Sequence, residues 1–420
     1  SKQFYHCFGC GAHGSAIGFL MEYRGLGYVE AIRELAQQAG LTVPEEPGRA
    51  AATARVAGLT DLLGRAAEHY RTRLKEAPAA IDYLKGRGIT GATAARFALG
   101  YSADTWQGLR DVFERYEDPR LVEAGLVIEG EEGKRYDRFR GRLMFPIRNA
   151  RGAVIGFGAR VMGAGEPKYL NSPETPVFHK GQELYGLHEA REAIRSAGRA
   201  LVVEGYMDVI QLAQAGFLES VAALGTALTS HHVATLLRLT DHVVFAFDGD
   251  AAGRKAARRA LEASLPVIGE RQRASFLLLP EGEDPDSLIK RAGAEAFRDE
   301  LAQALPLSRF FLRTLAQGRA LDVPEDRSSL LADARPLLQS MPANALRLQL
   351  TQELAAAART SLDDVEALFG LRRQRPSRAP VARPSRHAEV EDLKRRIVQH
   401  LLAHPVLARE FSDSIIDEIV

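Results

Sequence analysis

The sequence predicts a multidomain protein of mixed α/β and α+β class, with a mostly parallel sheet at its centre and helices on both faces of that sheet. Strand-length apolar runs alternate with amphipathic helical runs between Arg199 and Leu279, which is the pattern of successive βαβ units. The chain before Arg199 mixes helical and strand patterns, whereas the chain after Pro285 has a helical pattern to about Gly370. At 420 residues, the protein is too long for a single hydrophobic core.

The first segment, residues 1–43, is predicted to be part of a zinc-binding domain. Cys7 and Cys10 have the spacing of two ligands on one zinc ion, but they make only half of a tetrahedral site. His6 and His13 could complete it; the alternatives are two free thiols or a weakly held ion. A redox role for the cysteine pair is disfavoured because no thioredoxin-like βαβ pattern surrounds it.

The next part of the chain is predicted to be a linker followed by a basic mixed module. Residues 44–58 contain Pro44, Pro47 and Gly48 and are expected to be the linker. The module, residues 59–195, begins with helical patterns and then changes to strand patterns. The expected helices span 59–73 and 81–85 with short helices on to Arg96, and the expected strands span 127–128, 142–147 and 154–159.

The central domain, residues 196–290, is predicted to contain the parallel sheet. Right-handed βαβ connections place its helices on both faces. The expected strands span 200–204, 219–223, 242–247 and 274–279, and the expected helices span 206–215, 230–238 and 251–265. A helical bundle is expected to follow over residues 291–370.

The end of the chain is predicted to be a disordered linker and the beginning of another domain. Residues 371–388 carry six Arg, three Pro and no acid, a composition that does not support a packed core. An amphipathic pattern starts at Glu389 and runs to Val420. These 32 residues are too few to bury a sizeable core alone.

Composition describes a soluble protein of the reducing cytoplasm. Hydrophobic residues make up 46% and charged residues 26%, and no apolar run has the length needed to cross a bilayer. The net charge is only +1, but ten Lys and Arg face three acids between Lys134 and Lys180. Such a basic stretch is typical of a protein that holds a polyanionic backbone.

Specific basic and polar residues of this stretch are candidates for nucleic-acid or nucleotide binding. Arg138, Arg140 and Arg142 alternate along an expected strand, so their guanidinium groups should share one face and bind phosphate oxygens. Surface ion pairs are the alternative for any one of them. Further candidates at loop positions are Lys168, Tyr169, Asn171 and Lys180.

Three acidic clusters follow apolar runs in the central domain. They are Glu204, the pair Asp248 and Asp250, and the pair Asp284 and Asp286. Acids that follow parallel strands meet at the carboxyl edge of the sheet, where α/β folds bind ligands. Oxygen ligands without His or Cys favour two Mg²⁺ or Mn²⁺ ions, the usual apparatus for chemistry at phosphorus. Strand-ending turns with helix N-caps are the alternative for each cluster, and the third cluster could be a solvated turn.

These acidic motifs resemble the Toprim domain of bacterial primases, topoisomerases and some repair nucleases. The sequence that flanks these acids narrows the resemblance to bacterial replicative primases of the DnaG type. The matching motifs are Glu204-Gly-Tyr-Met-Asp208, Phe247-Asp-Gly-Asp-Ala-Ala-Gly-Arg254, Gly282-Glu-Asp-Pro-Asp286, Tyr136-Asp-Arg-Phe-Arg140, Arg142-Leu-Met-Phe-Pro-Ile147, Pro167-Lys-Tyr-Leu-Asn-Ser-Pro-Glu-Thr175 and Phe178-His-Lys-Gly181.

The resemblance implies a DNA-dependent RNA polymerase that makes short primers on single-stranded template from nucleoside triphosphates. Glu204, Asp248 and Asp250 would be catalytic, with Glu204 either a general base or only a metal ligand, and Asp284 and Asp286 would complete the Mg²⁺ set. The basic groove would comprise Arg138, Arg140, Lys168 and Lys180, with Tyr169 and Asn171 as second choices. Rival interpretations are a Toprim nuclease or topoisomerase and a non-catalytic adaptor that binds single-stranded DNA.

The resemblance also implies partners and missing segments. Zn²⁺ would occupy the complete N-terminal domain, whose other Cys/His pair lies upstream in the family, so the chain is expected to be truncated there. Residues 389–420 would open the domain that docks on the replicative helicase, and single-stranded-DNA-binding protein is a further candidate partner. The expected location is the bacterial cytoplasm, at the nucleoid and replisome.

Overall fold

The structure is a computed structural model of the chain. It describes residues 4–9, 12–24, 26, 28–41, 49–163 and 165–371, together with 395, 396 and 399. The chain divides into two units, residues 1–365 and 366–420, and the fold described below belongs to the first, except for the last residues of the final helix. The predictions for residues 372–388 and most of 389–420 lie outside the described residues.

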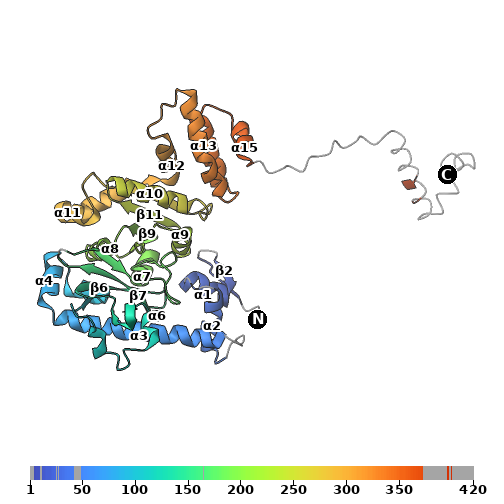
Figure 1. The fold of residues 1–420 in the computed structure, drawn as a ribbon. Helices are drawn as coiled ribbons and strands as arrows, with labels where there is room; N and C mark the ends of the chain where they lie inside the picture. Colours follow the sequence, from blue (N-terminus) through green and yellow to red (C-terminus); the bar gives the residue numbers. More distant parts are fainter. Residues whose placement is uncertain are drawn as a thin grey trace, which may run out of the picture. The chain divides into compact units, whose positions relative to one another are not determined.

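A five-stranded, mostly parallel sheet occupies the centre of the first unit, in the order β10-β9-β11-β12-β13 (Figure 1). Its strands are β9 (Ala200–Val203), β10 (Ser220–Ala222), β11 (His242–Phe247), β12 (Arg273–Leu278) and β13 (Leu305–Pro306). The first four are parallel to one another, and β13 is antiparallel to β12. The four predicted strands are therefore confirmed, and β13 is an addition within a segment predicted to be helical throughout.

Helices connect these strands as the predicted alternation requires. They are α8 (Tyr206–Gln214), α9 (Ser230–Leu237) and α10 (Ala251–Ser264). β11 is buried over its last five residues, because the sheet is covered on both faces. A strand that is buried on both faces needs a continuous apolar run, and the sequence of this strand, His242-Val-Val-Phe-Ala-Phe247, has one.

A four-stranded antiparallel sheet, ordered β3-β6-β7-β8, precedes the parallel sheet. Its strands are β3 (Gly100–Ser102), β6 (Arg142–Arg148), β7 (Val154–Val161) and β8 (Tyr169–Asn171). Successive residues of β6 belong to different cores: Leu143 and Phe145 pack in the core that includes α8, whereas Met144 packs in the core under α3. The first of these cores continues into the parallel sheet, so the two sheets share one hydrophobic interior.

Helices and a hairpin complete this module. They are α3 (Arg49–Lys75), α4 (Pro78–Gly86), α5 (Gly91–Arg96), α6 (Pro119–Glu123) and α7 (Leu187–Ala197), with hairpin strands β4 (Val127–Glu129) and β5 (Arg135–Asp137). The prediction of a linker over 44–58 is wrong from Arg49 onward, because α3 begins there. The run Ala50-Ala51-Ala52 explains the early start, since alanine is the strongest helix former.

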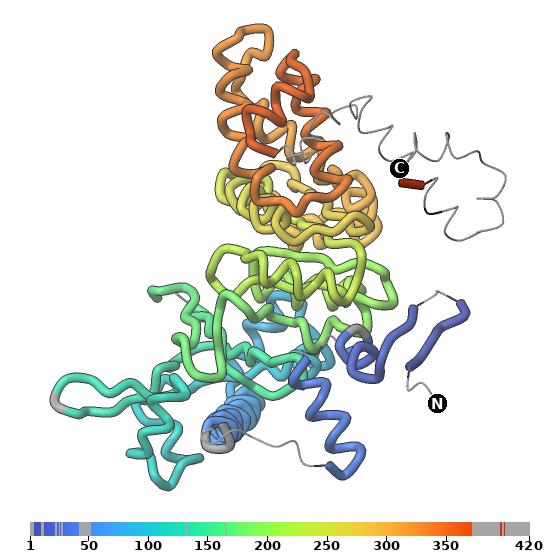
Figure 2. The backbone as a smooth tube through the Cα atoms, turned by 90° about the vertical axis from the view of Figure 1, so that its right-hand side faces the viewer, coloured from blue at the N-terminus to red at the C-terminus, as the bar shows by residue number. Residues whose placement is uncertain are grey.

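The N-terminal segment forms a small group of elements with its own core, shown in blue in Figure 2. It contains the hairpin β1 (Phe4–His6) and β2 (His13–Ser15), and the helices α1 (Ala16–Arg24) and α2 (Tyr28–Gln38). Helical periodicity in the sequence predicts helices at 17–23 and 28–39, and both are confirmed. Leu20, Leu26 and Ala31 are the buried residues of this core.

Helices follow the parallel sheet, as predicted. They are α11 (Pro285–Ala302), α12 (Leu307–Ala316), α13 (Pro324–Ser340), α14 (Ala345–Ala357) and α15 (Leu362–Phe369). α11 is kinked at Gly293, where the backbone has φ of 86°. Across the part of the chain that the structure describes, none of the helices combines the length and apolarity needed to span a membrane.

Candidate active site

The three acidic clusters lie at the carboxyl edge of the parallel sheet, as their positions in the sequence predict. Glu204 follows β9 and Asp248 follows β11, the strand paired with β9. Asp284 follows β12, the next strand along, after a short turn. The backbone N–H of Asp248 donates a hydrogen bond of 3.2 Å to Oε1 of Glu204, which ties two of the clusters together.

Two glycines allow the chain to be this compact around Asp248. A Cβ atom on Gly249 would lie 2.3 Å from the carbonyl oxygen of Leu279 and 2.5 Å from that of Pro280. A Cβ atom on Gly253 would lie 2.1 Å from the carbonyl oxygen of Asp248. The turn after β11 is therefore in close contact with the end of β12 on one side and with the first turn of α10 on the other.

The carboxylates repel one another across a partly buried pocket. Burial, followed by the charges of Glu204, Asp284 and Asp250, raises the pKa of Asp248 from its ordinary 3.8 to about 7. Burial and the charge of Asp250 raise the pKa of Glu204, although the hydrogen bond from Asp248 opposes the shift. The structure thus brings Glu204, Asp248, Asp250 and Asp284 within electrostatic range of one another.

Asp208 is a further member of this pocket and was not among the predicted site residues. Burial, followed by the charges of Asp248 and Asp284, raises its pKa to about 7. Its Oδ2 accepts a hydrogen bond of 2.9 Å from the N–H of Gly205, so it also caps the first turn of α8.

The donor chemistry of the pocket fits divalent cations that prefer oxygen. Closely spaced carboxylates with raised pKa values lose their mutual repulsion when a cation lies between them. Over the described residues, no three His, Cys, Asp or Glu side chains converge tightly enough to enclose one ion.

Some acidic residues also have the structural roles that were the alternative interpretation. Asp250 caps α10 by accepting a 2.7 Å hydrogen bond from the N–H of Gly253, and Asp284 caps α11 in the same way through Ser287. Capping uses one carboxylate oxygen and leaves the other available. Asp286 differs, because its Oδ2 is 2.6 Å from Nζ of Lys290 one turn along α11.

Tyr206 joins the acidic pocket to the antiparallel sheet. Its hydroxyl donates a 2.7 Å hydrogen bond to Oδ1 of Asn171 on β8, and its ring stacks on Phe145 at 5.3 Å between centroids. A Cβ atom on Gly158 would lie 2.5 Å from the Tyr206 ring, so β7 can pass under the ring only with glycine there. Tyr206 is only two residues from Glu204, so its hydrogen bond to Asn171 holds β8 beside the pocket. The candidate residue Asn171 therefore also lies beside the pocket.

The prediction that Arg138, Arg140 and Arg142 alternate along one strand is wrong. β5 ends at Asp137 and β6 begins at Arg142, and Gly141 breaks the strand between them with φ of 60°. Arg138 is half-buried and its Nε donates a 2.9 Å hydrogen bond to the carbonyl oxygen of Gly125. Burial lowers the pKa of this guanidinium. The hydrogen bond to Gly125 joins two parts of the fold, so it is a structural contact.

Arg140 and Arg142 also bind backbone carbonyls. Nη1 of Arg140 donates a 2.5 Å hydrogen bond to the carbonyl oxygen of Asp137, and its guanidinium lies over the rings of Trp106 and Tyr136 at 4.5 and 5.1 Å. Nη1 of Arg142 donates a 2.7 Å hydrogen bond to the carbonyl oxygen of Pro167. The shortage of acids within the segment therefore does not leave these cations without partners.

Other candidates of the basic stretch remain open to ligands. Lys168 is exposed, and no hydrogen bond or ion pair of its ammonium group is found among the described residues. Tyr169, its neighbour on β8, lies 6.1 Å from the ring of Tyr206 between centroids. The backbone of Lys180 is held by Glu174 and by His232, which fixes the loop that carries its side chain.

Arg160 on β7 is a cation near Tyr169 that sequence reasoning missed. Its guanidinium lies over the rings of Tyr83 and Tyr169 at 5.5 and 5.4 Å. The side chain is only 6% exposed, and its Nε has no hydrogen-bond partner. No sequence pattern indicates it, because Arg160 lies in an otherwise apolar strand and its aromatic neighbours come from other elements.

The predicted zinc ligands are described only in part. His6 and His13 face each other across the β1–β2 hairpin, with ring centroids 5.9 Å apart. Cys7 follows directly and is exposed, whereas Cys10 lies outside the described residues. The zinc assignment therefore stays a prediction at this point.

The parallel sheet with acids at its carboxyl edge, beside a basic antiparallel module, defines a class of protein: enzymes with a Toprim domain. Family models agree. Residues 198–274 match the Toprim domain and residues 69–191 the N-terminal domain of the DNA primase catalytic core. Residues 1–51 match the CHC2 zinc finger, and residues 308–363 match the DnaB-helicase binding domain of primase.

Individual relatives narrow the class to one family. DNA primase of Neisseria meningitidis serogroup A is 48% identical over 378 residues, which are 88% of this chain and 64% of that protein. A DNA primase domain from Pseudomonas aeruginosa has a solved structure that is 48% identical and covers 74% of this chain and 99% of its own, with a TM-score of 0.71. A DnaG primase catalytic domain bound to single-stranded DNA is 42% identical, covers 74% of this chain and 99% of its own, and has a TM-score of 0.69.

The chain belongs to the family of bacterial DnaG-type DNA primases. It spans less than two thirds of the length of the curated relatives it matches. The helicase-binding match lies on residues 308–363, in the segment predicted to be a helical bundle. The resemblance had implied that helicase docking begins in residues 389–420, and this expectation is corrected.

Proposed function

We propose that the protein is a DNA primase: a DNA-dependent RNA polymerase that joins ribonucleotides into short primers on single-stranded DNA. Membership of the primase family supports this function, as does the DNA-bound state described for one structural relative. The observation that carries the proposal is the acidic pocket of Glu204, Asp248, Asp250 and Asp284, joined through Tyr206 to the antiparallel sheet.

The pocket is the proposed site of nucleotidyl transfer. Two Mg²⁺ or Mn²⁺ ions bound by these carboxylates would lower the pKa of the attacking 3′-hydroxyl and stabilise charge on the triphosphate. The chain's own contribution is to hold the carboxylates in place, through the bond from Asp248 to Glu204 and through the caps of α10 and α11. Asp208 adds a carboxylate, and Asp286 serves the site more weakly because Lys290 engages it.

Helix ends and cations beside the pocket favour an anionic substrate. α8, α10 and α11 begin next to the acidic residues, and helix N-termini attract phosphate groups. Lys168, Lys180 and Arg160 are the cations that we assign to template or nucleotide phosphates. Tyr169 and Asn171 on β8 are assigned to a base or sugar, since they adjoin Tyr206 at the pocket. Arg138 and Arg140 are proposed to support the fold around this surface instead of binding phosphate.

The flanking parts supply the proposed partners. The CHC2 match supports Zn²⁺ binding through Cys7 and Cys10, and the match on 308–363 supports binding of the replicative helicase. Nucleoside triphosphates are the proposed substrates, and single-stranded-DNA-binding protein is a further proposed partner. A bacterial cytoplasmic location at the replisome follows from this role.

The test is an analysis of reaction products from the parent and from two matched variants, whose substituted residues lie at opposite ends of β11. The protein is incubated with single-stranded template, labelled ribonucleoside triphosphates and Mg²⁺, and the products are separated by length. We expect short RNA chains from the parent, at least about a hundredfold less from Asp248→Asn, and parental amounts from Asp241→Asn. Asp241 precedes β11 at its other end and is exposed, so it controls for charge loss alone. Cleaved template, or equal synthesis by both variants, would contradict the proposal.

A further inference from the structure

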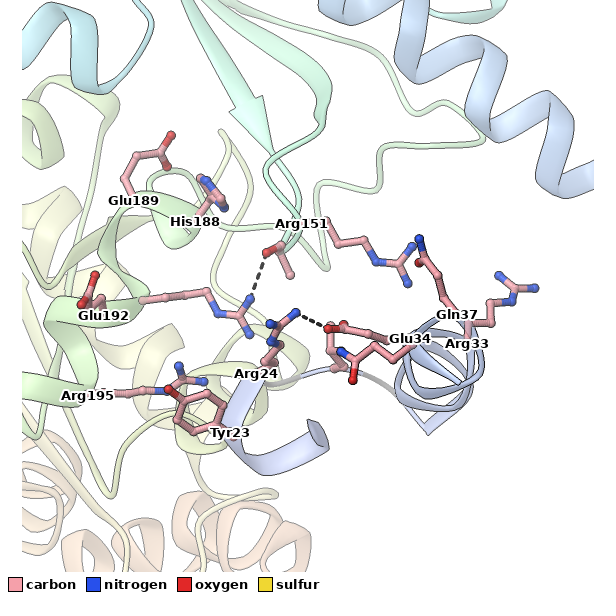
Figure 3. Close-up of a pocket in the computed structure, with 14 residues that line it drawn as sticks. Tyr23, Arg24, Arg33, Glu34, Gln37, Arg151, His188, Glu189, Glu192 and Arg195 are labelled. Atoms are coloured by element: carbon pink, nitrogen blue, oxygen red, sulfur yellow. Dashed lines mark hydrogen bonds and ion pairs between the residues drawn. The ribbon is translucent and has the colours of Figure 1, made fainter. Parts of the chain in front are cut away.

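A second charged cavity lies away from the acidic pocket, between the N-terminal segment and α7. Its volume is about 1060 Å³. Three parts of the chain form its walls: the ends of α1 and α2, the turn between β6 and β7, and one face of α7 (Figure 3). The charged side chains that line it are Arg24, Arg33, Arg151, Arg191 and Arg195, with Glu34, Glu189 and Glu192.

The α7 wall is built by helical spacing. His188, Arg191 and Arg195 are three and four residues apart, so they lie on one face of the helix. The adjacent face carries Ala190 and Ile194, which are buried in the protein. The hydrophobic core thus fixes the direction in which the two arginines point.

The cations of this wall are close together, and only some of their N–H groups have partners. Nη1 of Arg191 donates a 2.9 Å hydrogen bond to the carbonyl oxygen of Ala150. Burial, followed by the charges of Arg195 and Arg24, lowers the pKa of Arg191. Nη2 of Arg195 is buried without a hydrogen-bond partner, and so is Nδ1 of His188. A buried guanidinium N–H without an acceptor is costly, so an acceptor oxygen from a ligand or from water would stabilise Arg195 here.

The acidic side chains neutralise this cavity only in part. Glu30 lies 3.4 Å from Nη2 of Arg151, and its charge opposes the lowering of the Arg191 pKa. Glu34 forms an ion pair with Arg24 on the N-terminal side of the cavity, and Glu189 pairs with Arg148, which does not line it. Glu192 is exposed. In Figure 3 the labelled Arg24, Arg195 and Tyr23 lie together, and the guanidinium of Arg195 is 5.0 Å from the centre of the Tyr23 ring.

We propose that this cavity binds an oligophosphate anion, which links the N-terminal segment to α7 of the catalytic module. Guanidinium forks bind phosphate oxygens in pairs, and here they come from both sides of the junction: Arg24 from α1, Arg191 and Arg195 from α7. A single phosphate would not span a cavity of this volume, whereas consecutive phosphates reach several forks at once. The ligand offsets the repulsion between Arg24 and Arg191, so its binding stabilises the contact between the two parts.

The binding test uses inorganic tripolyphosphate as the probe, titrated into the whole chain by calorimetry with EDTA present. EDTA removes divalent cations, so binding through ions at the acidic pocket does not contribute. We expect saturable binding that is at least about tenfold weaker in Arg195→Gln and in Arg24→Gln, since each loses a charge-assisted contact. Arg71→Gln, on the exposed surface of α3, should bind like the parent, and so should Asp248→Asn.

Equal affinity of Arg195→Gln, Arg24→Gln and the parent would overturn the proposal, as would an absence of binding to the parent. Retention of binding in Asp248→Asn separates this site from the proposed catalytic pocket, so either inference can fail alone. Circular dichroism of each variant establishes that it is folded before its affinity is compared.

A second readout tests the link between the two parts, and competition identifies the source of the phosphates. Amide hydrogen exchange of residues 16–24 should slow when tripolyphosphate is added to the parent and should not change in Arg195→Gln. Unchanged exchange in the parent would contradict the linking role. Displacement of tripolyphosphate by a nucleoside triphosphate would support a free nucleotide as the ligand, and displacement only by a short thymidine oligonucleotide would support a phosphodiester backbone.

Discussion

Replacing Gly249 by alanine should disrupt the acidic pocket through a steric effect on the backbone. The new Cβ atom would lie 2.3 Å from the carbonyl oxygen of Leu279 and 2.5 Å from that of Pro280. Ordinary carbon–oxygen contacts are no closer than about 3.3 Å, so the two backbone segments would have to separate by about 1 Å. Neither oxygen can move by a side-chain rotation, because both belong to the main chain.

The expected cost follows from this displacement. Overpacking against a rigid partner destabilises proteins by about 1–3 kcal/mol, and backbone contacts place Gly249→Ala at the upper end. Asp248 and Asp250 flank the substituted residue and would move with it, away from Asp284. A displacement of about 1 Å at a catalytic site lowers turnover roughly a hundredfold. We therefore expect a fall in thermal midpoint of about 6–9 °C and a roughly hundredfold loss of primer synthesis.

Thermal unfolding followed by circular dichroism, together with the ribonucleotide assay, measures both effects. Gly64→Ala is the matched control, because Gly64 lies within α3 and a Cβ atom there would meet nothing within 4 Å. That control should be more stable by about 0.5–1 kcal/mol and fully active. Parental stability and activity in Gly249→Ala would refute the argument that close backbone contact positions the carboxylates.

Three further predictions test other parts of the site. Because the pKa of Asp248 is raised to about 7, the stability that its protonated form contributes is complete below the ordinary pKa of 3.8 and is lost as pH rises through about 7. Without divalent cations, Asp248→Asn should therefore be about 1 kcal/mol more stable than the parent at about pH 8 and as stable as the parent near about pH 4. Mg²⁺ should raise the thermal midpoint of the parent more than that of the variant. Identical pH profiles of stability for the two proteins would contradict this prediction. Tyr206→Phe leaves Asn171 without its 2.7 Å hydrogen bond from the tyrosine hydroxyl. We expect a loss of about 1 kcal/mol of stability, measured by urea unfolding, and a several-fold decrease in primer synthesis. Unchanged primer synthesis would show that β8 does not serve the site. Arg138→Ala should lower the thermal midpoint with little change in DNA affinity, because Arg138 binds a backbone carbonyl. Lys168→Ala should lower DNA affinity at an unchanged midpoint and should reduce the slope of log affinity against log salt concentration by about 1. Binding titrations at several salt concentrations measure both effects, and the reverse pattern would overturn the assignment.

The parallel sheet could be predicted from sequence because its signals are local. Each strand is a continuous apolar run, and each connecting helix is amphipathic, so β9, β11 and β12 lie within one or two residues of their expected bounds. Glu204, Asp248 and Asp284 then follow from the rule that parallel strands end at one edge. The acidic residues alone predicted metal-assisted chemistry at phosphorus, and the family resemblance added the particular reaction expected of the site.

The basic module was harder to predict because its contacts are not local. β8 has only three residues, too few for a period-two pattern, and β3 is equally short. The alternation of Arg138, Arg140 and Arg142 imitated a strand, but the positive φ of Gly141 interrupts it. No sequence pattern could place the rings of Tyr83 and Tyr169 against Arg160, since they come from separate parts of the chain.

The most direct test of the account is a count of bound Mn²⁺ by electron paramagnetic resonance. The account predicts two ions per chain that Mg²⁺ displaces, nearly complete loss of both in Asp248→Asn, and full retention in Asp241→Asn, whose charge lies at the other end of β11. If the parent bound no Mn²⁺, or if Asp248→Asn bound as many ions as the parent, the acidic pocket would not be the metal site of a nucleotidyl transferase.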